Sequence, residues 1–253
     1  MWVSIAWLLI FDWRAQVIAH RIEEATVVDA WQAAAQSIYD NGEQHSLMVI
    51  ARRPTTFSRE WLQLYSPHLI SEDCDKISSV VKTVFPYKLA SIPRISRAEI
   101  YRRYLEVRSR YLTRPGHARV GWGTYFERLI AYGPRHVNQL ERVIEKINLW
   151  PRAEAALVMH LSDPGLDGPQ RRGGPCWHFG EIIWHPNDSL DLVVVYRNHD
   201  YLNKALGNFI ALGMLLAFIA DATGKRPGNL ICHSVHAYTP RKNLLREFIA
   251  VVR

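Results

Sequence analysis

The feature that most constrains the fold is one long apolar segment, YLNKALGNFIALGMLLAFIADATGK, which covers residues 201–225. Its composition predicts a single long helix that ends at Gly224, because glycine often terminates a helix in a left-handed conformation. A helix that is apolar on nearly every side has to be covered by other elements. We therefore expect this helix to pack against a sheet.

Apolar runs bounded by turn residues predict strands before and after this helix. The expected strands lie in residues 1–11, 45–51, 155–161, 176–185, 190–197 and 228–238. Helical periodicity predicts helices over residues 27–41, 74–85, 96–112 and 137–147, the first of them capped by Asp29. Strands and helices mix without strict alternation. The expected fold is therefore α+β: a single domain over residues 1–253, with one large mixed sheet packed against helices.

The N-terminal run MWVSIAWLLIF is apolar, but it is too short to span a bilayer and lacks the basic region of a signal peptide. The three cysteines, Cys74, Cys176 and Cys232, are an odd number and form no CxxC motif. They indicate neither a disulfide framework nor a zinc site. We expect a cytoplasmic protein without a membrane partner or a bound metal.

The chain is basic, with a net charge of +7 and a pI of about 9.4. This balance suggests an anionic partner such as a nucleotide, a nucleic acid or an acidic cofactor, although charge alone favours a solvated basic surface. The basic residues are scattered and form no dense block. Nucleic acid is therefore not the expected partner.

Two residues near the predicted strands have reactive or charged side chains. Cys176 follows Gly-Gly-Pro at the start of a strand, but free cysteines are commonly buried and inert, so this residue alone is a weak signal. Arg197 closes the apolar run LDLVVVYR and needs an anion or several hydrogen-bond acceptors. An anion could be Asp200, in a structural ion pair, or the phosphate of a ligand.

Three further polar side chains have both a structural and a functional interpretation. Asn208 lies on the apolar helix, where its amide needs either a backbone carbonyl or a hydrogen-bonding partner such as the edge of a base. His236 and Tyr238 are two residues apart on a strand and therefore face the same side. They form either a satisfied core pair or a joint site for a hydroxyl group.

Taken in order, these residues resemble the thymidylate synthase and nucleotide hydroxymethylase superfamily. The shared pattern is Pro175-Cys176, then Arg197-Asn198-His199-Asp200, then Asn208, then His236-Ala237-Tyr238. Upstream, GWGTYFERLIAYGPRHVNQLERVIEKI is similar to the family's Tyr-Gly and Asp-Gln-Leu region, with Tyr125 as its tyrosine. The resemblance covers about residues 119–245, is specific over 175–238, and is closer to the short archaeal-type and hydroxymethylase branches. The N-terminal part diverges.

The resemblance implies folate-dependent transfer of a one-carbon unit to C5 of a pyrimidine nucleotide, as hydroxymethylation or reductive methylation. The implied donor is 5,10-methylenetetrahydrofolate, and the implied assembly is a homodimer. Cys176 would attack C6 of the pyrimidine, Tyr125 would lie near the waters that transfer protons, and Asp200 would anchor the ring. The implied substrate-binding residues are Arg197 and Asn198 at the phosphate, Asn208 at the base, and His236 and Tyr238 at the sugar.

The sequence departs from the family at several positions. Trp177 stands where the family commonly has histidine, and only Arg152 is found where a pair of arginines reaches the partner's phosphate. Arg171 and Arg172 are expected to replace that pair. Only 15 residues follow Tyr238, where the familiar synthases have a long closing segment. A site less closed to water favours a hydroxymethyl product.

Two alternatives remain open at this point. The altered phosphate arginines are compatible with a thymidylate-synthase-fold protein that lacks folate chemistry and binds a nucleotide or RNA. They are also compatible with a tailoring enzyme that uses the same cysteine on a modified nucleoside.

Overall fold

The computed structural model describes residues 20–63, 77–112, 122–150, 157–167 and 174–252. The strand expected in residues 1–11 lies outside this part of the chain.

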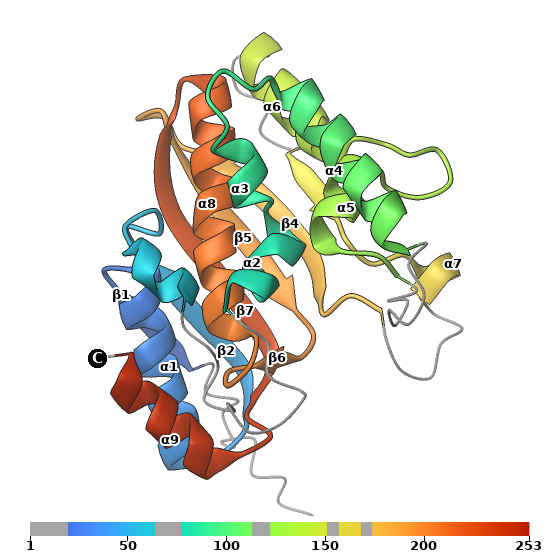
Figure 1. The fold of residues 1–253 in the computed structure, drawn as a ribbon. Coiled ribbons are helices and arrows are strands. Elements are labelled where there is room, and N and C mark those ends of the chain that lie inside the picture. The colour runs from blue at the N-terminus through green and yellow to red at the C-terminus, as the bar shows by residue number, and fades with distance from the viewer. Residues whose placement is uncertain (1–19, 64–76, 113–121, 151–156, 168–173, 253) are drawn as a thin grey trace, which may run out of the picture.

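Figure 1 shows the arrangement of the elements along the chain. The strands are β1 (Arg21–Glu24), β2 (Gln44–Ala51), β3 (Val158–His160), β4 (Trp177–Trp184), β5 (Ser189–Tyr196), β6 (His199–Asp200) and β7 (Arg226–Tyr238). The helices are α1 (Val27–Asn41), the 3-10 helix η1 (Arg59–Gln63), α2 (Ile77–Val84), α3 (Tyr87–Ala90), α4 (Arg97–Leu112), α5 (Tyr125–Ile130), α6 (Gln139–Leu149), α7 (Pro164–Asp167), α8 (Ala205–Thr223) and α9 (Lys242–Val251).

The strands of the described chain form one mixed sheet in the order β1-β2-β7-β5-β4-β3, with β6 paired to β7. The pairs β1–β2, β5–β7 and β6–β7 are parallel, whereas β2–β7, β4–β5 and β3–β4 are antiparallel. The expected α+β class and the mixed sheet are therefore confirmed.

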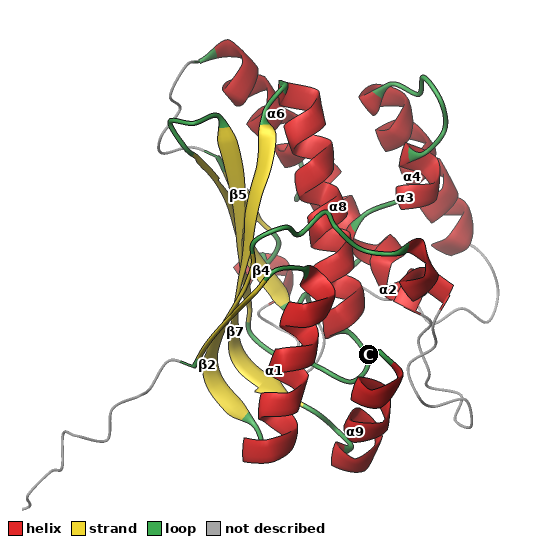
Figure 2. Cartoon of the chain, turned by 90° about the vertical axis from the view of Figure 1, so that its left-hand side faces the viewer, coloured by secondary structure: helices red, strands yellow, loops and turns green. Residues whose placement is uncertain are grey.

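The described helices are gathered on one face of the sheet, as Figure 2 shows edge-on. Leu47, Val194 and Cys232 point into this layer and are buried. The alternate residues of the same strands face the other side, which the described helices leave uncovered. Partly exposed apolar side chains on this open face are Met48, Ile50, Val193, Val195, Ile231 and Val235.

Helix α8 lies in the centre of the helical layer, against α1, α2, β5 and β7. It is long and apolar enough to cross a membrane, but 72% of it is buried inside the fold, as the sequence predicts for a core helix. Two glycines allow close neighbours: a Cβ at Gly213 would lie 2.1 Å from the Pro54 carbonyl oxygen, and one at Gly207 would lie 2.7 Å from Val80. The helix ends at Gly224, whose φ is +64°. The sequence therefore predicted the C-terminal end of α8 correctly.

The start of α1 differs from the prediction. Thr26, and not Asp29, is the capping residue. The Thr26 hydroxyl accepts the backbone N–H of Asp29, while the Asp29 carboxylate accepts the backbone N–H of Thr26. This reciprocal capping box satisfies two N–H groups that have no partner within the helix.

Candidate active site

Three of the candidate residues meet because of the directions of their strands. Cys176 immediately precedes β4, Arg197 immediately follows β5, and His236 lies near the end of β7. Since β4 is antiparallel to β5 and β5 is parallel to β7, these three points fall at one end of the sheet. The Arg197 backbone joins them: its N–H donates to the Cys176 carbonyl (2.9 Å), and its carbonyl accepts the N–H of His236 (3.1 Å).

Tyr125 is the first residue of α5 and lies directly against Cys176. Its hydroxyl accepts the backbone N–H of Cys176 at 3.2 Å. Burial raises the pKa of the Tyr125 phenol well above its ordinary value, so the phenol keeps its proton at neutral pH. Tyr125 is therefore a neutral hydrogen-bonding group that contacts the cysteine backbone.

The buried Arg128 guanidinium fixes α5 in this position. It forms two hydrogen bonds with the Asp167 carboxylate, at 2.6 and 2.7 Å. It also donates to the carbonyls of Leu161 and Trp122. A bidentate arginine–carboxylate pair has a defined geometry, and here it holds α5 against the segment that follows β3.

The Cys176 thiol is partly buried among the predicted site residues. Burial raises its pKa above the ordinary value, while the positive charge of Arg197 and a hydrogen bond from it oppose that rise. The Arg197 Nε also donates to the Pro175 carbonyl at 3.2 Å, which holds the guanidinium beside the thiol. Cys176 is therefore a thiol whose ionisation depends on Arg197.

Trp177 occupies the position where histidine was expected, and its side chain is structural. It is completely buried, donates its indole N–H to the Phe179 carbonyl, and stacks on Tyr196. The β4–β5 register shifts between Trp177 and Phe179. Burial lowers the pKa of the His178 imidazole, and the positive charge of Arg197 lowers it further. An imidazole one residue later than expected is therefore within the range of the Arg197 charge.

Asp200 shapes the turn that leads into α8. Its carboxylate accepts the backbone N–H groups of Leu202 and Asn203, at 2.9 and 3.0 Å, and the side-chain amide of Asn203 at 2.8 Å. Burial raises its pKa, and these hydrogen bonds oppose the rise. Asp200 therefore sets the course of the chain between Arg197 and Asn208.

The amide of Asn208 contacts a histidine side chain. Its Nδ2 lies 3.2 Å from Nε2 of His199, and the other ring nitrogen of His199 lies 2.9 Å from the Ser234 hydroxyl. All three side chains are buried. Burial lowers the pKa of His199 to about 3, so this ring is neutral at physiological pH. A buried polar chain therefore runs from β7 through β6 to α8.

His236 and Tyr238 face the same side of β7, as predicted, and their rings stack at 5.2 Å. The two ring nitrogens of His236 each lie 3.0 Å from an oxygen, one of Asn198 and one of the Glu43 carboxylate. Asn198 and Glu43 therefore hold the His236 ring from both of its nitrogens. Burial is the main cause that raises the pKa of Tyr238.

Among the described residues, the structure links Cys176, Tyr125, Arg197, Asp200, Asn198, His236 and Tyr238 through contacts or charge interactions. Asn208 contacts His199 and none of these seven directly in the recorded hydrogen bonds. Arg171 and Arg172 lie outside the described residues, and so does Arg152. Sequence reasoning missed His199, Ser234, Glu43 and His178 as members of the cluster. Of these four residues, only His199 could have been suspected from the local sequence, because it stands between the predicted site residues Arg197 and Asp200.

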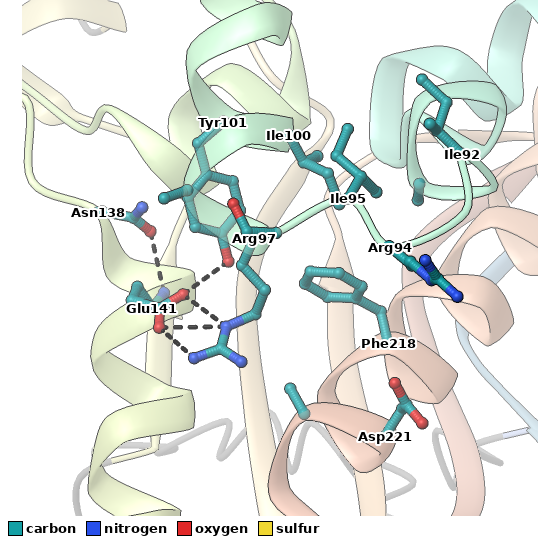
Figure 3. Close-up of a pocket in the computed structure, with 14 residues that line it drawn as sticks. Ile92, Arg94, Ile95, Arg97, Ile100, Tyr101, Asn138, Glu141, Phe218 and Asp221 are labelled. Carbon is teal, nitrogen blue, oxygen red and sulfur yellow. Dashed lines mark hydrogen bonds and ion pairs between the residues drawn. The ribbon is translucent and has the colours of Figure 1, made fainter.

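A cavity of about 790 Å³ lies among elements of which only α8 carries one of these site residues (Figure 3). It is bounded by the α3–α4 connection, α4, α6 and the C-terminal end of α8. Arg97 there forms an ion pair with Glu141, to which the Tyr101 hydroxyl also donates. Within the described chain, no group of three His, Cys, Asp or Glu side chains could hold a metal ion.

The sequence is similar to two archaeal proteins, both named "Putative thymidylate synthase". The protein from Methanococcoides burtonii is 26% identical over 224 residues, which is 87% of this chain and 89% of the relative. The protein from Methanosarcina barkeri is 27% identical over 115 residues, which is 46% of this chain and 51% of the relative. No model of a protein family matches the sequence. The two relatives support the thymidylate synthase superfamily without distinguishing a branch.

Proposed function

We propose that this protein is an enzyme that transfers a one-carbon unit to C5 of a pyrimidine nucleotide, with Cys176 as the nucleophile. The observation that carries the proposal is the Cys176 thiol beside the Arg197 guanidinium, at the sheet end where Tyr125, Asn198, His236 and Tyr238 also lie. The two relatives named as thymidylate synthases favour the same chemistry over a fold without it.

In the proposed reaction, the Cys176 thiol loses its proton and the sulfur forms a bond to C6 of the pyrimidine. The electron pair of the C5–C6 double bond moves towards C5 and the O4 carbonyl, which makes C5 nucleophilic. C5 would then bond to the methylene carbon of the folate, whose two bonds to the folate nitrogens break in turn, and C5 would lose its hydrogen as a proton. Water, or a hydride from the released tetrahydrofolate, would add to that carbon, and the thiolate would leave from C6. Covalent catalysis of this kind divides one difficult substitution into easier steps.

The other side chains bind and orient the substrate. Arg197 is suited to the 5′-phosphate because a guanidinium matches phosphate oxygens in a bidentate geometry. Asn198 lies next to Arg197 and contributes to the same end of the site. Asn208 reads the base, while His236 and Tyr238 hold the sugar hydroxyl. Tyr125 keeps a neutral hydroxyl near the thiol, and Asp200 anchors the ring. Arg171 and Arg172 add charge at the phosphate.

The donor in this proposal is 5,10-methylenetetrahydrofolate, which supplies the carbon. A partly exposed aromatic surface fits a flat ring of this kind: the Trp122 ring lies 5.0 Å from the Tyr125 ring, and Tyr125 contacts the Cys176 backbone. Trp122 would hold the folate ring by stacking. Whether the product carries a methyl or a hydroxymethyl group depends on how well water is excluded there.

We also propose that the working protein is a cytoplasmic homodimer that pairs through its open sheet face. This face presents adjacent apolar side chains, including Ile231 and Val235, and Val235 is 45% exposed. Contiguous exposed apolar surface on a sheet commonly marks an interface. Sedimentation velocity should show a dimer that Val235→Asp converts to a monomer. A wild-type monomer at micromolar concentration would contradict the assembly.

The function is tested by tritium release. The protein is incubated with UMP, dUMP, CMP and dCMP labelled with tritium at C5, each with and without methylenetetrahydrofolate. We expect folate-dependent release of tritium from at least one nucleotide, and preferentially from a uracil nucleotide. Mass spectrometry of the product then distinguishes methyl from hydroxymethyl. No release from any of the four, despite nucleotide binding, would favour a nucleotide-binding protein without this chemistry.

A further inference from the structure

We propose that the cavity between α4, α6 and the C-terminal end of α8 (Figure 3) binds a small zwitterion, namely an amino acid or short peptide with a free amino group, a free carboxylate and an apolar side chain. Arg94 binds the carboxylate, Asp221 binds the ammonium group, and the Phe218 ring contacts the apolar side chain. The described lining of this cavity contains none of the residues assigned to one-carbon transfer. The proposal is therefore independent of the function proposed above.

The cavity has the size and the apolar surface of a small-molecule site. Its volume, about 790 Å³, lies within the range of about 300 to 1,000 Å³ that is typical of such sites. Phe218 lines the cavity and is partly exposed, and its ring packs against Phe85 with centroids 5.4 Å apart. Ile95 and Ile100 belong to the same lining. The apolar side chain of a ligand therefore has a fixed surface against which it can be buried.

The charges in the lining complement a zwitterion. Two arginines and two acidic residues line the cavity, and one pair is already neutralised, because Arg97 binds both carboxylate oxygens of Glu141 at 3.0 and 2.7 Å. Arg94 and Asp221 remain. Within the part of the chain that the structure describes, neither forms an ion pair or a side-chain hydrogen bond, and Figure 3 draws none for them. Asp221 would repel an anion and Arg94 would repel a cation, whereas a zwitterion pairs with both.

Arg94 occupies a backbone position that favours glycine. The Ile95 N–H donates to the Ile92 carbonyl at 3.3 Å, which closes a β-turn with Pro93 and Arg94 at its centre. Proline requires a negative φ, and the φ of Arg94 is +59°. This combination defines a type II turn, whose third position is usually glycine because other residues are strained there. The arginine therefore destabilises the turn that carries it.

Asp221 is also unfavourable at its own position. It lies in the last turn of α8, which contains no basic residue. The C-terminal end of a helix carries a partial negative charge, so a carboxylate there is repelled. An ammonium group bound to Asp221 would remove this repulsion.

Both residues thus stand where stability alone favours another residue type. They come from two separate elements, the α3–α4 connection and α8, and they line one cavity. Residues that conflict with local structural preferences are commonly those that serve a function. The occurrence of two such conflicts in one cavity, with opposite charges, is the reason for assigning Arg94 and Asp221 to a ligand.

Isothermal titration tests the charge requirement directly. The probes are L-leucine, L-phenylalanine and leucylphenylalanine, each compared with its amide, which lacks the carboxylate, and its N-acetyl form, which lacks the ammonium group. We expect at least one zwitterion to bind with a Kd below about 1 mM, and both of its modified forms to bind at least about tenfold more weakly. Equal binding of the N-acetyl form would indicate an anion site and overturn the proposal. So would the absence of binding of every zwitterion at about 10 mM.

Two variants separate ligand binding from folding. Arg94→Gly and Asp221→Asn should each raise the Kd of the zwitterion at least about tenfold, while the Tm of the protein stays the same or rises. Arg246→Ala and Glu247→Gln are the matched controls, because they remove the same charges at exposed positions of α9 and should leave the Kd unchanged. A clear fall in Tm in Arg94→Gly would show that this arginine stabilises the fold. That result, or an unchanged Kd, would refute its assignment to a ligand.

Photochemical cross-linking locates the site. The zwitterion that binds best, carrying a diazirine on its apolar side chain, is photolysed with the wild-type protein, and the labelled peptides are identified by mass spectrometry. We expect label within residues 90–101 or 218–222, which an excess of the unmodified zwitterion should prevent. Label confined to the end of the sheet that carries Cys176 would place the binding elsewhere and contradict the proposal. No nucleotide or folate takes part in these measurements, so their failure is distinct from a failure of the proposed function.

Discussion

Cys176→Ser is expected to abolish tritium release from the C5-labelled nucleotide, with a loss in kcat on the order of 10⁴-fold or more. A serine hydroxyl is a much weaker nucleophile than a thiolate at neutral pH, and nothing in the described site is placed to deprotonate it. Nucleotide affinity should change little, because the phosphate, base and sugar contacts are assigned to other residues. Isothermal titration with the nucleotide checks that separation of chemistry from binding.

A trapped adduct gives an independent test of the same residue. A nucleotide with fluorine at C5 lacks the hydrogen that must leave as a proton, so in the presence of the folate it should stay bonded to the enzyme. Peptide mass spectrometry should place the modification on Cys176 and find none in Cys176→Ala. Tritium release that persists in Cys176→Ala would remove this cysteine as the nucleophile.

Arg197→Met is expected to lower kcat/KM by about 10³-fold through two effects. Losing a charge-assisted contact to a phosphate weakens substrate binding by a few kcal/mol. Losing the positive charge beside Cys176 also raises the pKa of its thiol further, because Arg197 opposes the rise that burial causes. Arg197→Lys keeps the charge without the bidentate geometry and should recover part of the activity.

The effect on the thiol can be measured without substrate. Only the thiolate reacts with iodoacetamide, so alkylation of Cys176 should speed up as the pH rises through the thiol pKa. In Arg197→Met that profile should move to higher pH, and alkylation at pH 8 should slow by about tenfold for each unit that the pKa rises. Arg142→Met, at an exposed position on α6, is the matched control. An unshifted profile in Arg197→Met would separate Arg197 from the thiol.

The local elements were predictable because their signals are local. The apolar runs of β4, β5 and β7 and the composition of α8 are visible in short windows, and the structure confirms them. The strand order was not predictable in the same way. That β7 lies between β2 and β5 is decided by packing between segments far apart in the chain. The family resemblance, and not local sequence signals, therefore predicted that Cys176, Arg197 and His236 lie together. The directions of β4, β5 and β7 explain why they do.

The missed residues share one property: their partners are distant in sequence. His199 and Ser234 are 35 positions apart, and Glu43 and His236 are 193 apart. No periodicity or spacing rule connects such pairs. The capping residue of α1 was predicted wrongly for a different reason. Thr26 and Asp29 are both residue types that commonly cap helices, and the pair of hydrogen bonds between them makes Thr26 the cap and Asp29 the third helical residue.

The irregular pairing at the start of β4 affects how relatives of this protein should be compared. Side chains on a strand alternate between the two faces of the sheet. One extra residue in β4, between Trp177 and Phe179, therefore changes which face a given residue points to when positions are counted along the chain. A column-by-column alignment at Trp177 would record a histidine as lost. The imidazole of His178, one residue later, nevertheless lies within the range of the Arg197 charge. At this strand, the irregular pairing has to be taken into account before a residue after the cysteine is matched with one in a relative.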